Sequence, residues 1–170
     1  RCGHVGLLEY IYSLGLPFSH PPEMQIVWAC YSGRPEVVQF LVASGIDIRI
    51  DDDVVMKTVC NTADMGMMRA LITLGANARF DHDWPICIAA RAGCLTTISL
   101  LLEAGADLEA HNNEAFLNAM DRDHTHVVEF IIRHRKISVE RLNTALMIAE
   151  AERPFSKIVG ILRAARDEQM

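Results

Sequence analysis

The chain is poor in aromatic residues and has no long apolar run. Aromatic residues make up 6% of its 170 positions. No uninterrupted apolar segment approaches the roughly 18 residues that suggest a transmembrane helix, and no signal-peptide pattern is present. We therefore expect no membrane partner. The 51% of hydrophobic residues suits one globular or repeat body and argues against disorder.

The cysteines lack the spacing of a metal site. They number five, an odd count, and form neither a CxxC pair nor a Cys/His zinc pattern. A free cysteine inside a helix behaves as a small hydrophobic residue. These features favour a reduced, intracellular setting, with the cytoplasm as the simplest choice, and we expect no metal ion.

Basic residues are also scarce over most of the chain. The net charge is −6, and residues 1–120 carry fourteen acidic side chains against seven basic ones. A general basic surface for nucleic acid is therefore not expected. The sequence has no nucleophile elbow, no phosphate-binding loop and no Ser/His/Asp order. We expect no enzymatic activity and no cofactor.

A 30-residue period runs through the chain. One glycine position recurs as Gly15, Gly45, Gly75 and Gly105. Three apolar positions recur with the same period: Ala29, Val59, Ala89, Ala119 and Ala149; Leu8, Val38, Met68, Ile98, Val128 and Ile158; and Ile11, Leu41, Leu71, Leu101, Ile131 and Ile161. A fixed period of this length predicts a stacked array in which each unit contacts only its neighbours.

The clearest unit, residues 84–110, reads as two short helices followed by a glycine. Pro85 suits the first turn of a helix, because its missing N–H would be unbonded there in any case. Ala92 and Gly93 break this first helix, and Gly105 can supply the left-handed residue that ends the second. The apolar residues of the two helices stand at helical spacing: Ile86, Ile88, Ala89 and Ala90, then Leu95, Ile98, Leu101 and Leu102.

These residues resemble the ankyrin repeat. Its Thr-Pro-Leu-His-x-Ala start corresponds to Trp84-Pro85-Ile86-Cys87-Ile88-Ala89, and its turn between helices corresponds to Gly3-His4. Its Gly-Ala-Asp ending corresponds to Gly105-Ala106-Asp107, Gly75-Ala76-Asn77 and Gly45-Ile46-Asp47. The resemblance implies an all-α ankyrin-repeat solenoid, in which helix–turn–helix pairs stack and loops project from one edge to bind other proteins.

The period of this chain is shorter than the usual ankyrin unit of 33 residues. The three missing residues fall between the Gly-Ala-Asp ending and the next inner helix. The projecting β-hairpin should therefore be shortened to a tight loop with little or no strand. Units of 30 residues resemble those of giant-virus and some intracellular-bacterial ankyrin proteins.

We predict a single ankyrin-repeat domain over residues 1–170. The period divides this domain into six units. They are residues 1–23, which form a partial unit, then 24–53, 54–83, 84–113, 114–143 and 144–170, the last being a C-terminal cap. Because the first unit lacks its inner helix, we expect the natural protein to continue upstream. Trp28 falls at an inner-helix position that usually faces the core. Arg135 replaces the helix-ending glycine, so the preceding helix should end differently.

A polar residue stands before each inner helix. Asp53, Asp83, Asn113 and Asn143 recur every 30 residues, and Asp and Asn are favoured N-caps. We therefore predict a capping role for all four. The nearby Asp51, Asp52, Asp81 and His82 would complete an acidic loop edge. This edge could attract a basic partner, bind a hard cation or simply remain solvated.

A group of histidines lies in the fifth unit. His124 occupies the turn between helices, where ankyrin units often place a histidine for structure. His126 falls at the start of the outer helix and His134 near its end, more than a turn away. We therefore expect these three residues to share no zinc ion.

The resemblance also implies a contact surface, formed by the loops and the exposed end of each inner helix. Aromatic and arginine side chains are enriched among the residues that dominate binding, so Trp84, Tyr31 and Arg91 are the expected anchors. Trp84 could equally pack on its own neighbouring loop. The complete predicted surface is Tyr31, Ser32, Asp51, Asp52, Asn61, Thr62, Asp81, His82, Trp84, Arg91, His111, Asn112, Asp121 and Arg122.

The leading interpretation is a non-catalytic, monomeric protein–protein interaction module. A basic surface on the partner protein would suit the acidic loop edge. The first alternative is a segment that targets substrates or partners for a larger enzyme or a ubiquitin-ligase adaptor. The second is a scaffold segment that only spaces other domains and has no conspicuous surface patch.

Overall fold

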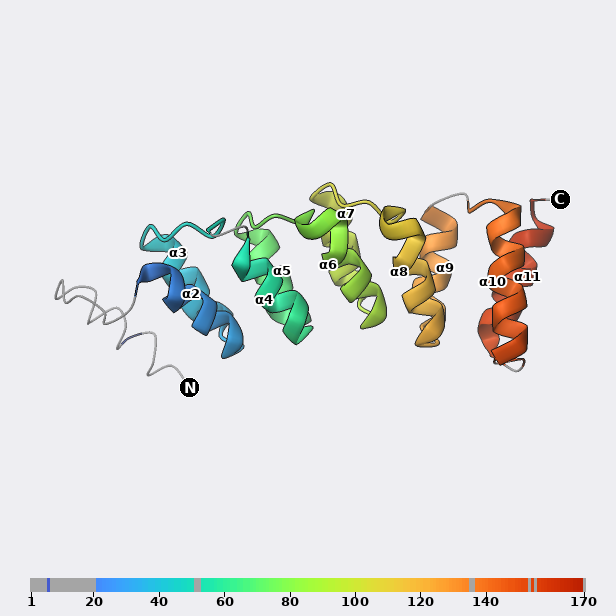
Figure 1. Ribbon diagram of the computed structural model, residues 1–170, viewed down its shortest axis with the longest axis horizontal. Coiled ribbons are helices and arrows are strands. Elements are labelled where there is room, and N and C mark those ends of the chain that lie inside the picture. Colours follow the sequence, from blue (N-terminus) through green and yellow to red (C-terminus); the bar gives the residue numbers. More distant parts are fainter. Residues whose placement is uncertain are drawn as a thin grey trace. The chain divides into compact units, whose positions relative to one another are not determined.

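The computed structural model describes residue 6 and residues 21–50, 53–134, 137–152, 154 and 156–169. This part of the chain forms ten α-helices and contains no β-strand (Figure 1). The helices belong to two compact bodies, residues 1–80 and residues 81–170. We call these bodies the first unit and the second unit; each contains several of the predicted repeats. The predicted all-α fold with shortened loops is confirmed over the described residues.

The first unit contains two helix pairs. They are α2 (Pro22–Tyr31) with α3 (Pro35–Ala43), and α4 (Val54–Thr62) with α5 (Met65–Thr73). Within each pair the helices contact one another, and the two pairs stack because α2 packs on α4 and α3 packs on α5. The first helices of the pairs therefore form one layer and the second helices form the other.

The second unit contains three further pairs. They are α6 (Phe80–Arg91) with α7 (Leu95–Glu103), α8 (Ala110–Asp121) with α9 (Thr125–His134), and α10 (Val139–Glu152) with α11 (Lys157–Asp167). Phe80, the first residue of α6, belongs to the first unit. Among the second helices, α9 packs on α11. Helix α10 begins at Val139, before the predicted unit boundary at residue 144.

The recurring apolar positions form the core. The residues at the alanine, isoleucine and leucine columns are buried throughout the described chain except Ile161, which is half-buried. The methionine-rich second pair follows the same rule, because Met56, Met67 and Met68 are almost fully buried. Their flexible side chains fill the space between helices, so packing accounts for them.

The recurring glycines end the second helices. Gly45, Gly75 and Gly105 have φ angles of +95°, +90° and +92°, a conformation that costs a residue with a Cβ atom about 1–2 kcal/mol. The acidic or amide residue two positions later closes a local turn. The Asp47, Asn77 and Asp107 side chains each accept a hydrogen bond from the backbone N–H two residues on, at 2.8–3.0 Å.

The prediction that residues before the inner helices act as N-caps is wrong. Asp53, Asp83 and Asn113 have left-handed φ angles of 59°, 72° and 66°, whereas an N-cap normally adopts the β region. The Asp53 carboxylate accepts a hydrogen bond from the Asn77 amide at 2.6 Å, and Asp83 accepts one from the Asp107 N–H at 3.2 Å. Both carboxylates therefore tie the start of a repeat to its end.

Asn143 is not an N-cap either, because it lies inside α10. The predicted acidic edge is also reduced. Asp83 is buried and Asp53 is half-buried, so neither presents a free, fully exposed carboxylate. Asp51 and Asp52 lie outside the described residues. Of this edge, the structure places Asp81 and His82 at the surface.

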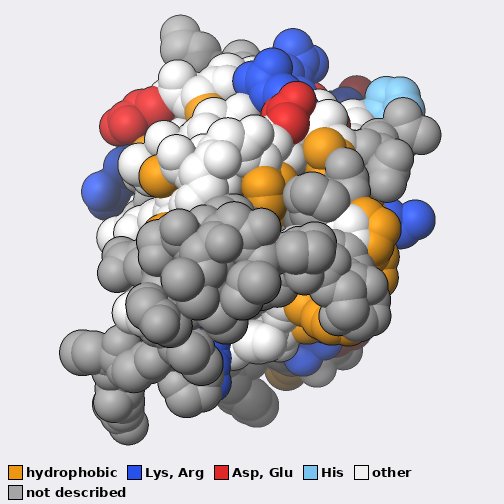
Figure 2. All heavy atoms as spheres, turned by 90° about the vertical axis from the view of Figure 1, so that its left-hand side faces the viewer, with side chains coloured by type: hydrophobic (Ala, Val, Ile, Leu, Met, Phe, Trp, Pro, Cys, Tyr) orange, Lys and Arg blue, Asp and Glu red, His pale blue; other side chains and the backbone are white. Residues whose placement is uncertain are grey.

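Trp28 does not face the core as predicted, since 48% of its surface is exposed. Helix α2 buries Ile26 and Cys30, and Trp28 lies on the opposite side with Met24 and Tyr31, at positions i, i+4 and i+7. Hydrophobic side chains in small separate patches are visible at the surface in the space-filling view (Figure 2). Gly3, His4 and Arg135 lie outside the described residues.

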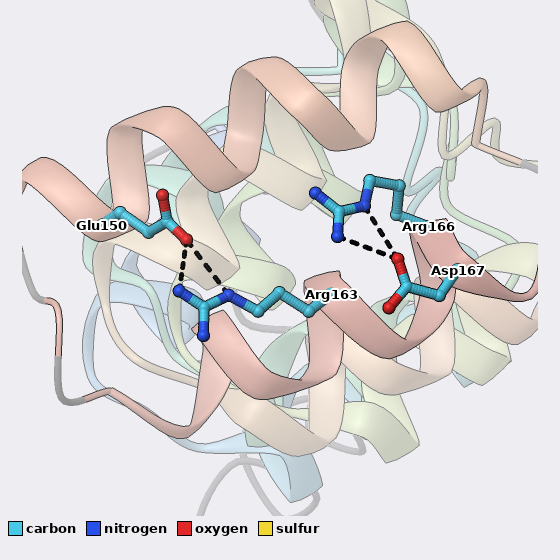
Figure 3. A network of polar contacts seen from close by, with 4 residues as sticks. All are labelled: Glu150, Arg163, Arg166 and Asp167. Atoms are coloured by element: carbon cyan, nitrogen blue, oxygen red, sulfur yellow. Dashed lines mark hydrogen bonds and ion pairs between the residues drawn. The ribbon is translucent and has the colours of Figure 1, made fainter.

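The last helix pair has polar contacts on its outer side. Arg163 of α11 donates two hydrogen bonds to Glu150 of α10, at 2.6 and 3.1 Å, and Arg166 contacts Asp167 beside it (Figure 3). Exposed pairs of this kind contribute about 0–1 kcal/mol each. Their contribution to the stability of this helix pair is therefore small.

Candidate functional site

The loop before α6 has an unusual backbone. Asp81, His82 and Asp83 adopt three successive left-handed conformations, with φ angles of 47°, 56° and 72°. Each such residue costs about 1–2 kcal/mol, so contacts elsewhere must hold the loop. Two of these contacts are hydrogen bonds: Asp83 accepts from the Asp107 N–H, and the Asp81 carbonyl accepts from His111 Nε2 at 3.2 Å. The loop is thereby fixed to the next repeat.

Aromatic rings gather around this loop. The His111 ring meets the edge of Trp84 at a centroid distance of 5.7 Å and lies 6.2 Å from the ring of His82. Because a carbonyl only accepts, the bond to Asp81 requires a proton on His111 Nε2. The structure thus brings together Asp81, His82, Trp84 and His111, four residues of the predicted surface. We call this group the loop cluster.

Trp84 was predicted either to anchor a partner or to pack on its own neighbouring loop, and the structure is compatible with both roles. It is half-buried and packs against His111, as expected for a residue supporting its neighbouring loop. The neighbouring His82 and Asp81 have side chains that are 89% and 60% exposed. The loop cluster therefore has a rigid aromatic centre and a polar, accessible rim.

The other predicted residues of the second unit lie at the C-terminal ends of α6 and α8. Arg91 follows Trp84 by seven positions, so both lie along one face of α6. The Arg91 carbonyl accepts a hydrogen bond from His124 Nε2 at 3.0 Å, which sets this end beside the end of α8. There Asp121 and Arg122 approach to 3.6 Å, and both are exposed. We call Arg91, Asp121 and Arg122 the turn cluster.

The histidines of the fifth predicted repeat, residues 114–143, serve the stacking of repeats. His126 Nε2 donates to the Gly93 carbonyl at 2.9 Å, and the His124 ring lies against Gly93. His134 instead stacks on Phe130, with centroids 4.9 Å apart. The rings of His124 and His126 also meet edge to face, with centroids 5.9 Å apart, whereas His134 is engaged apart from them. Among the described residues, no three His, Cys, Asp or Glu side chains are grouped to hold a metal ion.

In the first unit the predicted residues lie at the ends of the inner helices. Tyr31 and Ser32 end α2, Asn61 and Thr62 end α4, and all four are exposed. The hydroxyls of Ser32 and Thr62 donate to carbonyls of their own helices, which leaves Tyr31 and Asn61 as the outward-directed groups. Asp51, Asp52 and the Asn112 side chain lie outside the described part.

Three exposed apolar residues were missed by the sequence interpretation. Leu117 of α8 and Met147 and Ile148 of α10 are 47%, 72% and 43% exposed. They fall outside the recurring columns, so the period gave no reason to single them out. The only available signal was their size and apolar character. That signal does not identify an exposed site, because a large apolar residue on a helix face is equally consistent with burial.

Two buried thiols have shifted acidities. Burial is the main cause that raises the pKa of Cys30 to about 12, and the carboxylate of Asp64 adds to it. Burial also raises the pKa of Cys87 to about 12, with Glu114 next in importance. These thiols stay protonated at neutral pH and behave as core residues.

In the described part of the chain, no helix is long and apolar enough to cross a membrane.

Comparisons with known proteins agree with the helix-pair architecture. A family model described as ankyrin repeats, three copies, matches residues 26–112. The ankyrin repeat and KH domain-containing protein mask-1 of Caenorhabditis elegans is 26% identical over 97% of this chain and 7% of its own length. An ankyrin repeat and KH domain-containing protein of Caenorhabditis briggsae is 33% identical over 82% of this chain and 6% of its own length.

A viral protein is also similar. A putative ankyrin repeat protein of Acanthamoeba polyphaga mimivirus is 27% identical over 58% of this chain and 22% of its own length. This similarity agrees with the predicted resemblance to giant-virus proteins. The chain spans less than a quarter of the length of each of these relatives.

Proposed function

This chain belongs to the ankyrin-repeat family, and we propose that it is a non-catalytic module that binds another protein through its loops and inner-helix ends. Ankyrin repeats are generally protein–protein interaction modules. Within the second unit, the loop cluster and the turn cluster would form the contact surface. In the first unit, Tyr31 and Asn61 would take the corresponding role.

The division of labour between the residues carries this proposal. Residues that recur with the period are buried in the stack. The residues that distinguish one repeat from another, such as His82, Trp84 and Arg91, retain exposed surface at the helix ends. Exposed residues that do not serve stacking are available for a partner, and Trp and Arg are common among residues that dominate interfaces.

Charge and compartment complete the proposal. Asp81 places an exposed carboxylate in the loop cluster, so a partner with a basic side chain facing this cluster would be favoured, chiefly through its association rate. Cys30, Cys60, Cys87 and Cys94 are free thiols, which supports action in a reducing compartment such as the cytoplasm. We expect the module to act as a monomer.

The test is a quantitative affinity capture with mass spectrometry. The wild-type chain should capture a defined set of proteins, and the double variant Trp84→Ala with Arg91→Glu should lose most of them. The matched control is Leu100→Ala with Arg133→Glu, which also truncates one half-buried apolar side chain and reverses one exposed arginine, but on α7 and α9. Equal capture by the two double variants would refute the chosen surface.

A second candidate is that the module targets substrates or partners for a larger enzyme or ubiquitin-ligase adaptor. The observation that favours it is the small share of each relative that the chain matches, 6–7% in the two nematode proteins. The full-length reading frame decides between the candidates. A catalytic or ligase-binding domain in that frame would support the second, and its absence would leave the simple module.

A further inference from the structure

A groove runs between α8 and α10 in the second unit. It consists of two adjacent hollows of about 220 Å³ and about 190 Å³, and both are lined by Leu117 of α8 and Ile148 of α10. The larger hollow extends to the ends of these helices at Asp121 and Glu152. The smaller extends toward their beginnings at Asn113 and Arg141.

The walls of the groove expose apolar side chains that the fold does not need at the surface. Leu117 is 47% exposed and Ile148 is 43% exposed, whereas Cys87, one period before Leu117, and Ile88, two periods before Ile148, are buried. Burying such groups is favourable by about 25 cal/mol per Å². An apolar patch with a polar rim is typical of an interaction site.

The size of the hollows suits single side chains. A cavity of roughly 150 Å³ accepts a benzene molecule, so hollows of about 220 Å³ and about 190 Å³ can each take one bulky apolar side chain. Leu117 and Ile148 line both hollows, so the hollows adjoin. The occupant's two apolar side chains would therefore be neighbours in its structure. A peptide segment can present two such neighbours.

The two ends of the groove differ in charge. Asp121 and Glu152 give one end carboxylates, and Arg141 gives the other a guanidinium. A purely apolar occupant would leave both ends without complementary groups.

The geometry points to a docking groove for a short segment of another protein, carrying two neighbouring bulky apolar side chains between a basic residue and an acidic residue. The basic residue lies against Asp121 and Glu152. The acidic residue lies against Arg141. This inference rests on the proposed interaction function and adds to it the chemistry of the partner.

A selection from a displayed library of random 12-residue peptides tests this inference. The full chain and the variant Leu117→Arg with Ile148→Arg are screened in parallel. Peptides enriched on the wild type should share the basic–apolar–acidic pattern and should bind the double variant at least tenfold more weakly. Met24→Lys is the control, because Met24 is 42% exposed, similar to Ile148, but lies in α2 of the first unit.

A charge exchange provides the decisive second measurement. The variant Arg141→Glu with Asp121→Asn and Glu152→Lys leaves the apolar walls intact and should select peptides whose charged residues stand in the opposite order. Peptides without the charge pattern, or an unchanged preference, would overturn the inference. A concentration-dependent dimer that Leu117→Arg with Ile148→Arg abolishes would instead identify a second copy of the chain as the occupant, and would also overturn it.

Failure of this inference is distinguishable from failure of the proposed function. If the library yields no groove-dependent peptide while the chain still captures proteins through Trp84 and Arg91, only the groove is refuted. If the chain captures no protein at all, the interaction function itself fails.

Discussion

Gly93 shows how closely one repeat approaches the next at the scale of a single residue. Its φ is +70°, and a Cβ atom added there would lie 2.8 Å from the ring of His124. Gly105 has a similar left-handed backbone, with φ of +92°, but open space around it. The two glycines therefore separate the cost of backbone conformation from the cost of a steric clash.

Substitution of each glycine by alanine should separate the two effects. Gly105→Ala should lower the free energy of unfolding by about 1–2 kcal/mol, the left-handed penalty alone. Gly93→Ala should cost roughly 1–2 kcal/mol more, because the His124 ring must move and its bond to the Arg91 carbonyl weakens. Urea denaturation of both variants measures the difference, and equal losses would show that the ring yields freely.

The buried thiols predict a specific dependence of stability on pH. The pKa of both Cys30 and Cys87 is raised from 9.0 to about 12 in the folded chain. Between these values the unfolded chain loses a proton that the folded chain retains, so raising the pH favours unfolding. Each thiol should lower the free energy of unfolding by about 1.4 kcal/mol per pH unit in this window.

Denaturation midpoints measured from pH 8 to pH 11 test the thiol prediction. The variant Cys30→Ala with Cys87→Ala should lose the additional slope above pH 9. Cys94→Ala is the control and should keep this slope, because Cys30 and Cys87 are both intact in it. An identical slope in the two variants would assign the alkaline loss of stability to other groups.

At the scale of the element, Asp53 and Asp83, which precede two of the inner helices, are better understood as clasps than as caps. Asp83 has left-handed geometry, and its carboxylate reaches the Asp107 N–H at the far end of the same helix pair. Asp53 reaches Asn77 in the same way. The clasp links the two ends of a pair that contains only two short helices, and so stabilises the repeat as a closed unit.

Two substitutions distinguish the clasp from the cap. Asp83→Ser should cost about 1–3 kcal/mol, because serine tolerates the left-handed region poorly and is too short to reach the Asp107 N–H. Asp83→Asn should cost less than 1 kcal/mol, since asparagine keeps an acceptor and tolerates this geometry. Serine is among the best N-caps, so near-normal thermal stability of Asp83→Ser would restore the capping interpretation.

The helix pairs could be predicted from the sequence, but the role of the residues between them could not. Recurring apolar positions and glycines have one physical meaning each, burial and a left-handed turn. Asp and Asn, in contrast, are favoured both at N-caps and in left-handed positions. Their partner decides between these roles, and it lies 24 residues away, as Asp83 and Asp107 show.

The candidate site was predictable to the extent that it follows the period. Asp81 and His111 are 30 residues apart, so adjacent repeats place them side by side, and the structure adds their hydrogen bond. The α8–α10 groove was not predictable, because large apolar residues such as Leu117 and Ile148 are equally consistent with burial. Helix α10 begins earlier than the period implies, and no pattern in the sequence marks that shift.

At the scale of the whole molecule, repeats that contact only their neighbours should lose stability locally. Met68 is fully buried among the helices of the first unit, and Met68→Ala should remove about 2–5 kcal/mol there. Hydrogen exchange should accelerate most in α4 and α5, while amides of α10 and α11 keep their protection. Uniform acceleration along the chain would indicate that all repeats unfold as one cooperative body.

The central claim is that this ankyrin-repeat chain binds another protein through its loops and inner-helix ends. Hydrogen-exchange footprinting of the chain with a captured partner tests it most directly. We predict new protection at residues 81–84, at His111 and at the ends of α6 and α8, with little change in α7 and α9. Protection confined to α7 and α9 would contradict the claim, because it would place the partner on the opposite helix layer.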